Sequence, residues 1–147
     1  MPGRLELPLE QAAIPLLMSR PKIPWKWGAK LVELKPEEKL CVEIADKLRA
    51  LTGQGKLRGV WFHVPNEGKR NKLTAIILKA MGMISGTWDF PLMGPWGNGV
   101  IEIKVGTNGL TDNQKYFSYW CGLWQVKRKV CYSWAEVEAT LKEWGAI

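Results

Sequence analysis

A carboxylate and an amine alternate along one short run of the sequence, Val100-Ile-Glu-Ile-Lys-Val105. Because successive side chains of a strand point to opposite faces, Glu102 and Lys104 share one face if this β-branched run is a strand. Phosphodiester hydrolysis uses this combination: carboxylate oxygens hold a divalent metal, and a nearby cation positions the attacking water or stabilises the developing charge. The run therefore predicts one half of a metal-dependent hydrolytic site.

A metal site of this kind needs a second carboxylate, and the chain has three aspartates. Asp46 falls within one predicted helix and Asp112 in the first turn of another, whereas Asp89 falls in a predicted strand upstream of Glu102. If the two strands pair as a hairpin, Asp89 approaches Glu102 across the sheet. Asp89 is therefore the predicted second ligand.

The E-x-K spacing is not specific by itself, because it occurs four times: Glu33/Lys35, Glu37/Lys39, Glu67/Lys69 and Glu102/Lys104. Only the last pair lies in a β-branched run that follows a strand aspartate. On the residues alone, the solvent-facing side of a half-exposed strand explains Glu102 and Lys104 as well as catalysis does. Context, rather than spacing, selects this pair.

Hydrophobic periodicity predicts the elements that must position these residues. Helices are predicted over residues 36–53 and 73–81 and after Thr111 and Ser133, and strands over 60–64, 87–92, 100–105 and 125–131. The glycines and proline of MGPWGNG (93–99) favour a hairpin connection between the second and third strands. The order α-β-α-β-β-α-β-α predicts an α/β fold, a central mixed sheet flanked by helices with a restriction-endonuclease-like core.

The third helix begins with Thr111-Asp-Asn-Gln114, which reads as a capping box. Its apolar residues are predicted to be buried: Phe117, Trp120, Cys121 and Trp124. Position N3 of the box explains Gln114 without any catalytic role. The last helix opens with a second capping box, Ser133 to Glu136.

Length and composition indicate one domain, residues 36–147, preceded by an arm, residues 1–35, that carries five prolines. In the arm, Trp25 and Trp27 alternate with lysines and could stack on unpaired bases or pack against a second subunit. The three cysteines lack metal-site spacing and are predicted to be buried thiols. No apolar run approaches the ~20 residues of a membrane span, so a cytoplasmic protein is expected.

The chain is basic, with a net charge of +7 and a pI near 9.4. Lysines and arginines displace the counterions condensed on phosphates, so the charge favours a polyanionic partner such as nucleic acid. A mildly basic protein without an anionic partner is the alternative. Charge supports a nucleic-acid partner without establishing one.

Several segments taken together are more specific: the early helix with its glutamate, WFHVPNEGKR, LKAMG, GTWDFPLM, VIEIKV and TDNQKYF. From about residue 37 to residue 144 they resemble the virus-type replication-repair nuclease (VRR-NUC) family, a branch of the PD-(D/E)xK superfamily. The resemblance implies DNA hydrolysis with magnesium or manganese. It implies Asp89, Glu102 and the backbone carbonyl of Ile103 as metal ligands, Lys104 near the attacking water and Gln114 beside the site.

Further residues follow from the resemblance or lie close to its motifs. Such nucleases often add a glutamate from the early helix; Glu37 is favoured over Glu38 because it shares a face with the helix's apolar residues, although a first-turn acid also suits the helix dipole. His63 is expected to be a buried, hydrogen-bonded strand residue rather than a base, although it could line the site. In the loop after it, the residues that could grip a backbone phosphate, or be merely solvated, are Asn66, Lys69 and Arg70.

The family pattern usually has proline or a smaller residue where this chain has Trp88, before Asp89. Single-domain members resemble phage or prophage proteins, which implies a homodimer acting on branched DNA such as four-way junctions in a bacterial or phage-infected cell. The alternative of another class is a non-catalytic nucleic-acid-binding module that uses the same basic surface. An assembly protein with an oligomerising tryptophan-rich arm ranks last, because it leaves the clustered acids and lysine unexplained.

Overall fold

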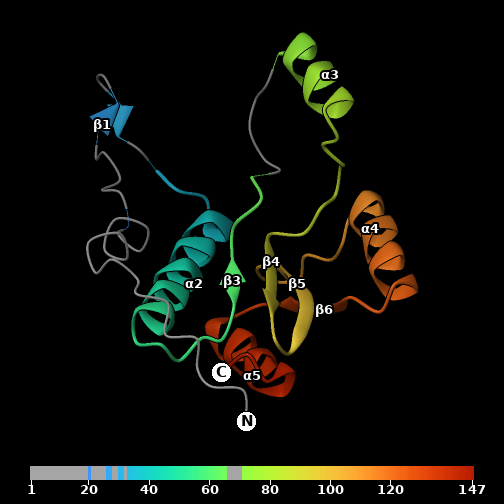
Figure 1. The fold of residues 1–147 in the computed structure, drawn as a ribbon. Helices are drawn as coiled ribbons and strands as arrows, with labels where there is room; N and C mark the ends of the chain where they lie inside the picture. The colour runs from blue at the N-terminus through green and yellow to red at the C-terminus, as the bar shows by residue number, and fades with distance from the viewer. Residues whose placement is uncertain (1–19, 21–25, 28–29, 32, 66–70) are drawn as a thin grey trace. The chain divides into compact units, whose positions relative to one another are not determined.

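The computed structural model describes residue 20 and residues 26–27, 30–31, 33–65 and 71–147 (Figure 1). The chain forms two compact units, residues 1–57 and residues 58–147. The loop residues predicted to contact DNA, Asn66, Lys69 and Arg70, lie outside the described residues, as do the side chains of Trp25 and Trp27. The predicted boundary between arm and domain, at residues 35 and 36, stays a prediction.

The first unit contains a long helix, α2 (Pro36–Gly53), with the predicted bounds. A short antiparallel pair, β1 (Lys26–Trp27) and β2 (Lys30–Leu31), precedes it. Pro36 suits the first helical position because its missing N–H has no partner there, and the carboxylate of Glu38 accepts the backbone N–H of Lys35 at 2.8 Å. The periodic residue Ile44 is buried, as is Leu48 one turn later.

The second unit is built on a four-stranded sheet in the order β3-β4-β5-β6. Its strands are β3 (Val60–Trp61), β4 (Phe90–Gly94), β5 (Gly97–Ile103) and β6 (Lys127–Cys131). The first three strands are antiparallel neighbours, whereas β5 and β6 run parallel. The sheet is therefore mixed, the predicted order of elements is confirmed, and the fold class is α/β.

Strands β4 and β5 form a tight hairpin in which Gly94 pairs with Gly97 and only Pro95 and Trp96 lie between them. Gly97 has φ 118°, a left-handed conformation that glycine adopts readily, which explains how so short a connection closes. Both strands extend further toward the turn than predicted: β4 ends at Gly94 instead of residue 92, and β5 begins at Gly97 instead of residue 100. Asp89, expected inside a strand, instead lies immediately before β4.

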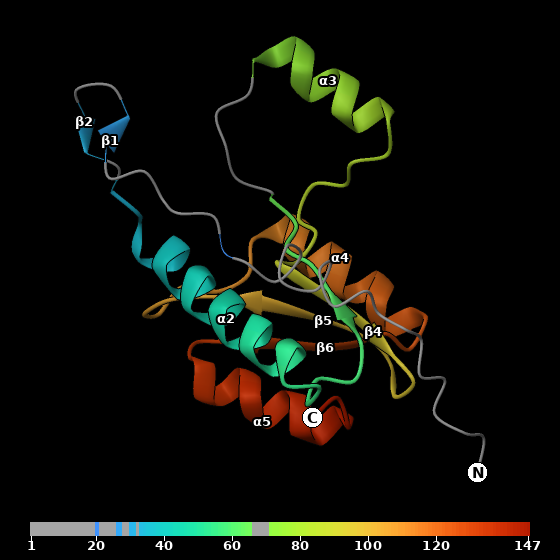
Figure 2. The ribbon, with the colours of Figure 1, turned by 60° about the vertical axis from the view of Figure 1, so that its left-hand side comes forward.

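Two helices cover opposite faces of this sheet, α4 (Asp112–Leu123) and α5 (Trp134–Trp144) (Figure 2). On one face, Cys121 of α4 packs in a buried cluster with Val100 and Trp88. On the other, Thr140 of α5 lies 3.8 Å from the sulfur of Cys131, Oγ1 to Sγ. Adjacent residues of a strand alternate between these two layers, as strand geometry requires.

Helix α3 (Lys72–Ala80) begins at Asn71, whose side chain accepts the backbone N–H of Thr74 at 2.7 Å. Its predicted bounds are close to those observed, and Gly82 follows it with φ 107°. None of its residues is buried. Across the described parts of the chain, no helix has the length and apolar character needed to cross a membrane.

The predicted packing of α4 is half wrong. Cys121 is buried and Phe117 partly buried, but Trp120 and Trp124 are 59% and 75% exposed. The helix lies on the sheet through the line of Gln114, Phe117 and Cys121, and Trp120 is about 100° around the helix from Cys121. Trp124 follows the last residue of α4. Periodicity alone therefore predicted more residues of this segment to be buried than the structure shows.

Candidate metal centre

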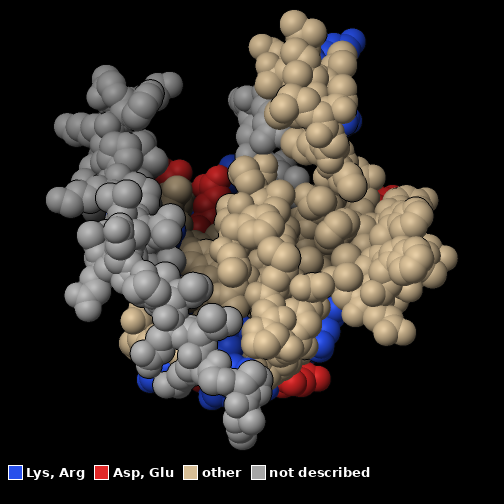
Figure 3. All heavy atoms as spheres, viewed as in Figure 1, with Lys and Arg blue, Asp and Glu red and all other residues tan. Residues whose placement is uncertain are grey.

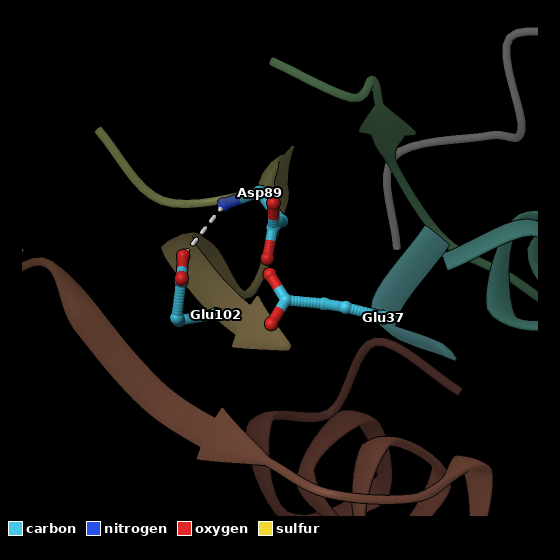
Figure 4. A group of neighbouring side chains, drawn as sticks. All are labelled: Glu37, Asp89 and Glu102. Atoms are coloured by element: carbon cyan, nitrogen blue, oxygen red, sulfur yellow. Dashed lines mark hydrogen bonds between the residues drawn. The ribbon is translucent and has the colours of Figure 1, made fainter. Parts of the chain in front are cut away.

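Asp89 and Glu102 lie directly opposite each other at the end of the β4–β5 ladder. Phe90 pairs with Ile101, so the same register continued by one residue places Asp89 against Glu102. The backbone N–H of Asp89 donates to Oε2 of Glu102 at 3.2 Å (Figure 4), and the backbone N–H of Ile103 donates to Oδ2 of Asp89 at 2.8 Å. A carboxylate oxygen of each residue lies within 4.8 Å of the other. Each carboxylate is thus held by the opposite backbone segment.

Two further polar groups converge on the other oxygen of Glu102. Nζ of Lys104 lies 3.2 Å from Oε1 of Glu102, and the side-chain amide of Gln114 donates a hydrogen bond to the same oxygen. Glu102 is only 2% exposed and Lys104 only 6%. A solvated strand face would leave both side chains in water, so burial excludes that explanation for this pair.

Gln114 caps α4 and also contacts Glu102. The side-chain Oε1 of Gln114 accepts the backbone N–H of Thr111 at 2.9 Å. The backbone N–H of Gln114 donates to the Thr111 hydroxyl at 3.3 Å, which completes the capping box. Its amide nitrogen remains available for Glu102. One planar amide therefore joins the start of α4 to the buried carboxylate, because its oxygen and nitrogen point in opposite directions.

The start of α4 is held against the sheet by residues whose role was not predicted. Nε1 of Trp88, a residue 2% exposed, donates to the backbone carbonyl of Gln114 at 3.1 Å. Gly86, with φ 83°, lies so close that a Cβ there would come within 2.4 Å of the Asn113 backbone. The departure of Trp88 from the family pattern marked the position, but a hydrogen bond across 26 residues has no local signal.

The electrostatics of the two carboxylates favour a bound cation. Burial, reinforced by the nearby charge of Asp89, raises the pKa of Glu102 to about 8, and Lys104 only partly opposes the rise. Burial also raises the pKa of Asp89, against the hydrogen bond from Ile103 and the charge of His63. A buried carboxyl and a partly buried one, each of which resists ionising beside the other, would be stabilised in their ionised forms by a positive ion between them.

The donor set fits a hard divalent ion. Carboxylate oxygens are the ligands that magnesium, calcium and manganese prefer, whereas softer ions select thiolate or imidazole. Asp89 and Glu102 can therefore hold a divalent ion between them. Their chemistry alone does not distinguish one hard ion from another.

The remaining predicted site residues are placed differently. His63 was wrongly predicted to be a buried strand residue: it is exposed and follows the end of β3, with its ring centroid 5.0 Å from that of Phe90, next to Asp89 in the chain. Glu37, also drawn in Figure 4, belongs to the first turn of α2 in the first unit. Its neighbour Glu38 already caps that helix through the backbone N–H of Lys35. The proposed ligand role of the Ile103 carbonyl stays a prediction.

Comparisons with known proteins leave the family open. No protein-family model matches the chain, and searches of curated proteins and of solved structures found no match. What stands is an α/β fold with a mixed four-stranded sheet and buried carboxylates able to hold a divalent ion.

Proposed function

We propose that this chain is a metal-dependent nuclease of the PD-(D/E)xK type, from the VRR-NUC branch, that hydrolyses DNA phosphodiester bonds. One observation carries the proposal: Asp89 faces Glu102, and Lys104 and Gln114 both reach the same oxygen of Glu102. If Lys104 and Glu102 were only a buried structural ion pair, no second carboxylate facing Glu102 would be required. A hydrolytic metal centre uses facing carboxylates as ligands and a nearby cation to stabilise developing charge.

The proposed metal is magnesium or manganese, held by Asp89 and Glu102 with the Ile103 carbonyl. Glu37 is the proposed additional ligand, since the carboxylate of Glu38 is already engaged in capping its own helix. When bound, such an ion supplies a more acidic water and neutralises charge on the phosphate. The all-oxygen donor set suits a hard divalent ion, and the choice of magnesium or manganese rests on the family resemblance.

The chain's own residues have distinct tasks in this proposal. The ammonium of Lys104, 3.2 Å from Glu102, is held where it can orient a water or stabilise negative charge on a phosphate oxygen. The amide of Gln114 fixes the rotamer of Glu102, and the backbone N–H of Ile103 fixes that of Asp89. These contacts preorganise the carboxylates before substrate arrives.

The proposed substrate is DNA, with branched forms such as four-way junctions preferred and a homodimer as the active form. The net charge of +7 supports a phosphate-rich partner. The preference for branched DNA and the dimer both rest on the family resemblance. If DNA is bound without being cut, the chain is instead a binding module that uses the same basic surface.

The test compares cleavage of linear duplex, single-stranded and four-way-junction DNA, with magnesium or manganese and with EDTA. Asp89→Asn and Lys104→Ala should each reduce the cleavage rate by at least about 100-fold, because each removes a charge needed in the transition state. The matched controls are Asp112→Asn and Lys142→Ala, which alter an exposed aspartate and an exposed lysine. Both controls should cut at the wild-type rate.

Calorimetric titration of manganese gives a second, independent reading. Asp89→Asn should weaken manganese binding, whereas Lys104→Ala should still bind it, because only the aspartate is a proposed ligand. Cleavage that survives both site substitutions would overturn the assignment. Salt-sensitive DNA binding with no cleavage under either metal would favour the binding module.

A further inference from the structure

Helix α4 is apolar on both sides, which is unusual for a helix at a protein surface. Its inner side, through Phe117 and Cys121, packs on the sheet. Its outer side and the C-cap residue Trp124 carry five large apolar or aromatic residues with these exposed fractions: Tyr116 70%, Tyr119 66%, Trp120 59%, Leu123 54% and Trp124 75%. Exposed apolar side chains gathered in one patch mark an interaction surface on a soluble domain.

The five outer residues form one continuous stripe, which we call the α4 stripe. Tyr116, Tyr119, Trp120 and Leu123 are spaced three and four residues apart, so they share one side of the helix, about a third of a turn around its axis from Phe117 and Cys121; Trp124 follows at the C-cap. Figure 3 shows the surface over α4, at the right of the view, as almost free of charged side chains. The charged residues on the helix, Asp112 and Lys115, both lie in its first turns.

The area of the α4 stripe matches that of a protein interface. Aromatic side chains bury about 150–250 Å² each, so four that are about two-thirds exposed, with Leu123, present on the order of 600–700 Å². A standard interface takes about 800 Å² from each partner. Tyrosine and tryptophan are also the residues most enriched at the centres of such interfaces.

Nucleic acid fits the α4 stripe less well than protein does. Aromatic platforms for unpaired bases alternate with basic residues that hold the phosphates, whereas residues 116–124 include no lysine or arginine; Lys115 precedes them and the Arg128 guanidinium lies against Gly122. The stripe also points away from the candidate metal centre, because Gln114, which reaches Glu102, lies on the inner side of α4. DNA bound at the carboxylates would not lie along it.

We infer that the α4 stripe is the interface of a symmetric dimer, occupied by the same stripe of a second copy. An uncharged surface can pair with itself without bringing like charges together, even though each chain carries +7. A two-fold axis across the helix runs the two α4 helices antiparallel, so the positive end of each helix dipole lies beside the negative end of the other. This inference assigns a surface to the homodimer of the proposed function and needs no catalytic step.

The test measures molar mass by sedimentation at concentrations between about 1 and about 100 µM. The full-length chain should sediment at about 33 kDa, twice 16.7 kDa. Trp120→Glu and, separately, Leu123→Arg should sediment as monomers with unchanged circular dichroism, because both side chains are exposed within one chain. Two variants are used so that one misfolded protein does not decide the result.

The matched control is Ile76→Glu on α3, an apolar residue that is 56% exposed on another helix. It should remain dimeric, as should Asp89→Asn, which disables the proposed active site but leaves the α4 stripe intact. A monomeric wild type at the highest concentration, or a dimer that survives both stripe substitutions, would overturn the inference. So would a dimer lost only in Ile76→Glu. Because mass is measured without cleavage, failure here is distinct from failure of the proposed nuclease activity.

Discussion

Glu102 is the residue on which the other polar groups of the candidate centre converge. Its two oxygens accept from three donors: the backbone of Asp89, the ammonium of Lys104 and the amide of Gln114. Complete satisfaction of this kind is what makes a buried carboxylate tolerable, since a buried polar group without partners is costly. The same contacts restrict the carboxylate to one orientation, which a metal ligand requires.

Glu102 should make the metal-free protein less stable as pH rises. A carboxyl whose pKa is raised from 4.5 to about 8 keeps its proton in the folded chain after the unfolded chain has lost it. Its stabilising contribution is therefore complete below pH 4.5 and is lost as pH rises to about 8. The limiting slope for one such group is about 1.4 kcal/mol per pH unit.

Urea unfolding in EDTA at several pH values between 5 and 8 measures this effect. Glu102→Gln cannot ionise, so its free energy of unfolding should fall less over this range than that of the wild type. Glu143→Gln, which changes an exposed glutamate of α5, should keep the wild-type pH dependence. Identical pH profiles for wild type and Glu102→Gln would contradict the raised pKa.

At the scale of elements, the position of the α4 N-terminus decides whether Gln114 reaches Glu102. Trp88 and Gly86 both contact this end of the helix, one through a hydrogen bond and the other through close backbone approach. The segment before β4 therefore does two things. It places Asp89 at the end of the central strand β4, and it sets the distance between the N-terminus of α4 and that end of the sheet.

Gly86→Ala should destabilise the second unit more than Gly82→Ala does. Both glycines have positive φ, 83° and 107°, so both alanines carry backbone strain of about 1–2 kcal/mol. Only at position 86 does the added Cβ meet backbone atoms, at 2.4 Å, whereas nothing lies within 4 Å of it at position 82. The clash should add about 1–3 kcal/mol.

Urea unfolding measures the loss of stability in both alanine variants. Backbone strain from a positive φ affects both, so the difference between the two losses reports the clash at position 86. Manganese titration should also show weaker binding for Gly86→Ala than for Gly82→Ala, since displacement of α4 removes the Gln114 amide from Glu102. Equal losses of stability in the two variants would show that the close approach of Gly86 to α4 has no energetic weight.

At the scale of the whole molecule, the excess of 21 basic over 14 acidic residues should govern DNA binding. Each phosphate contact releases condensed counterions, so affinity should fall at least about tenfold between ~50 and ~200 mM salt if two or more phosphates are held. Asp89→Asn should show the same salt slope, because it changes no phosphate-binding cation. Fluorescence anisotropy in EDTA measures both proteins, and affinity that is independent of salt would exclude an electrostatic DNA surface.

Local patterns were sufficient for much of the fold and for the central acidic pair. Proline at a helix start, 3.6-residue periodicity and capping residues predicted α2 with its observed bounds and the start of α4 at Thr111. A strand glutamate following a strand aspartate predicted that Asp89 and Glu102 would face each other, as the register confirms. These features depend on residues close together in the chain, so sequence spacing describes them well.

Tertiary structure alone decided which of these groups are buried and what they touch. Strand alternation predicted that Glu102 and Lys104 share one face of the sheet. The packing of α4 on that face helps to exclude solvent from it. Likewise, periodicity could not distinguish the inner side of α4 from an equally apolar outer side, and Trp120 and Trp124 were wrongly predicted to be buried. Whether a face is covered depends on segments distant in the chain, and local periodicity holds no information about them.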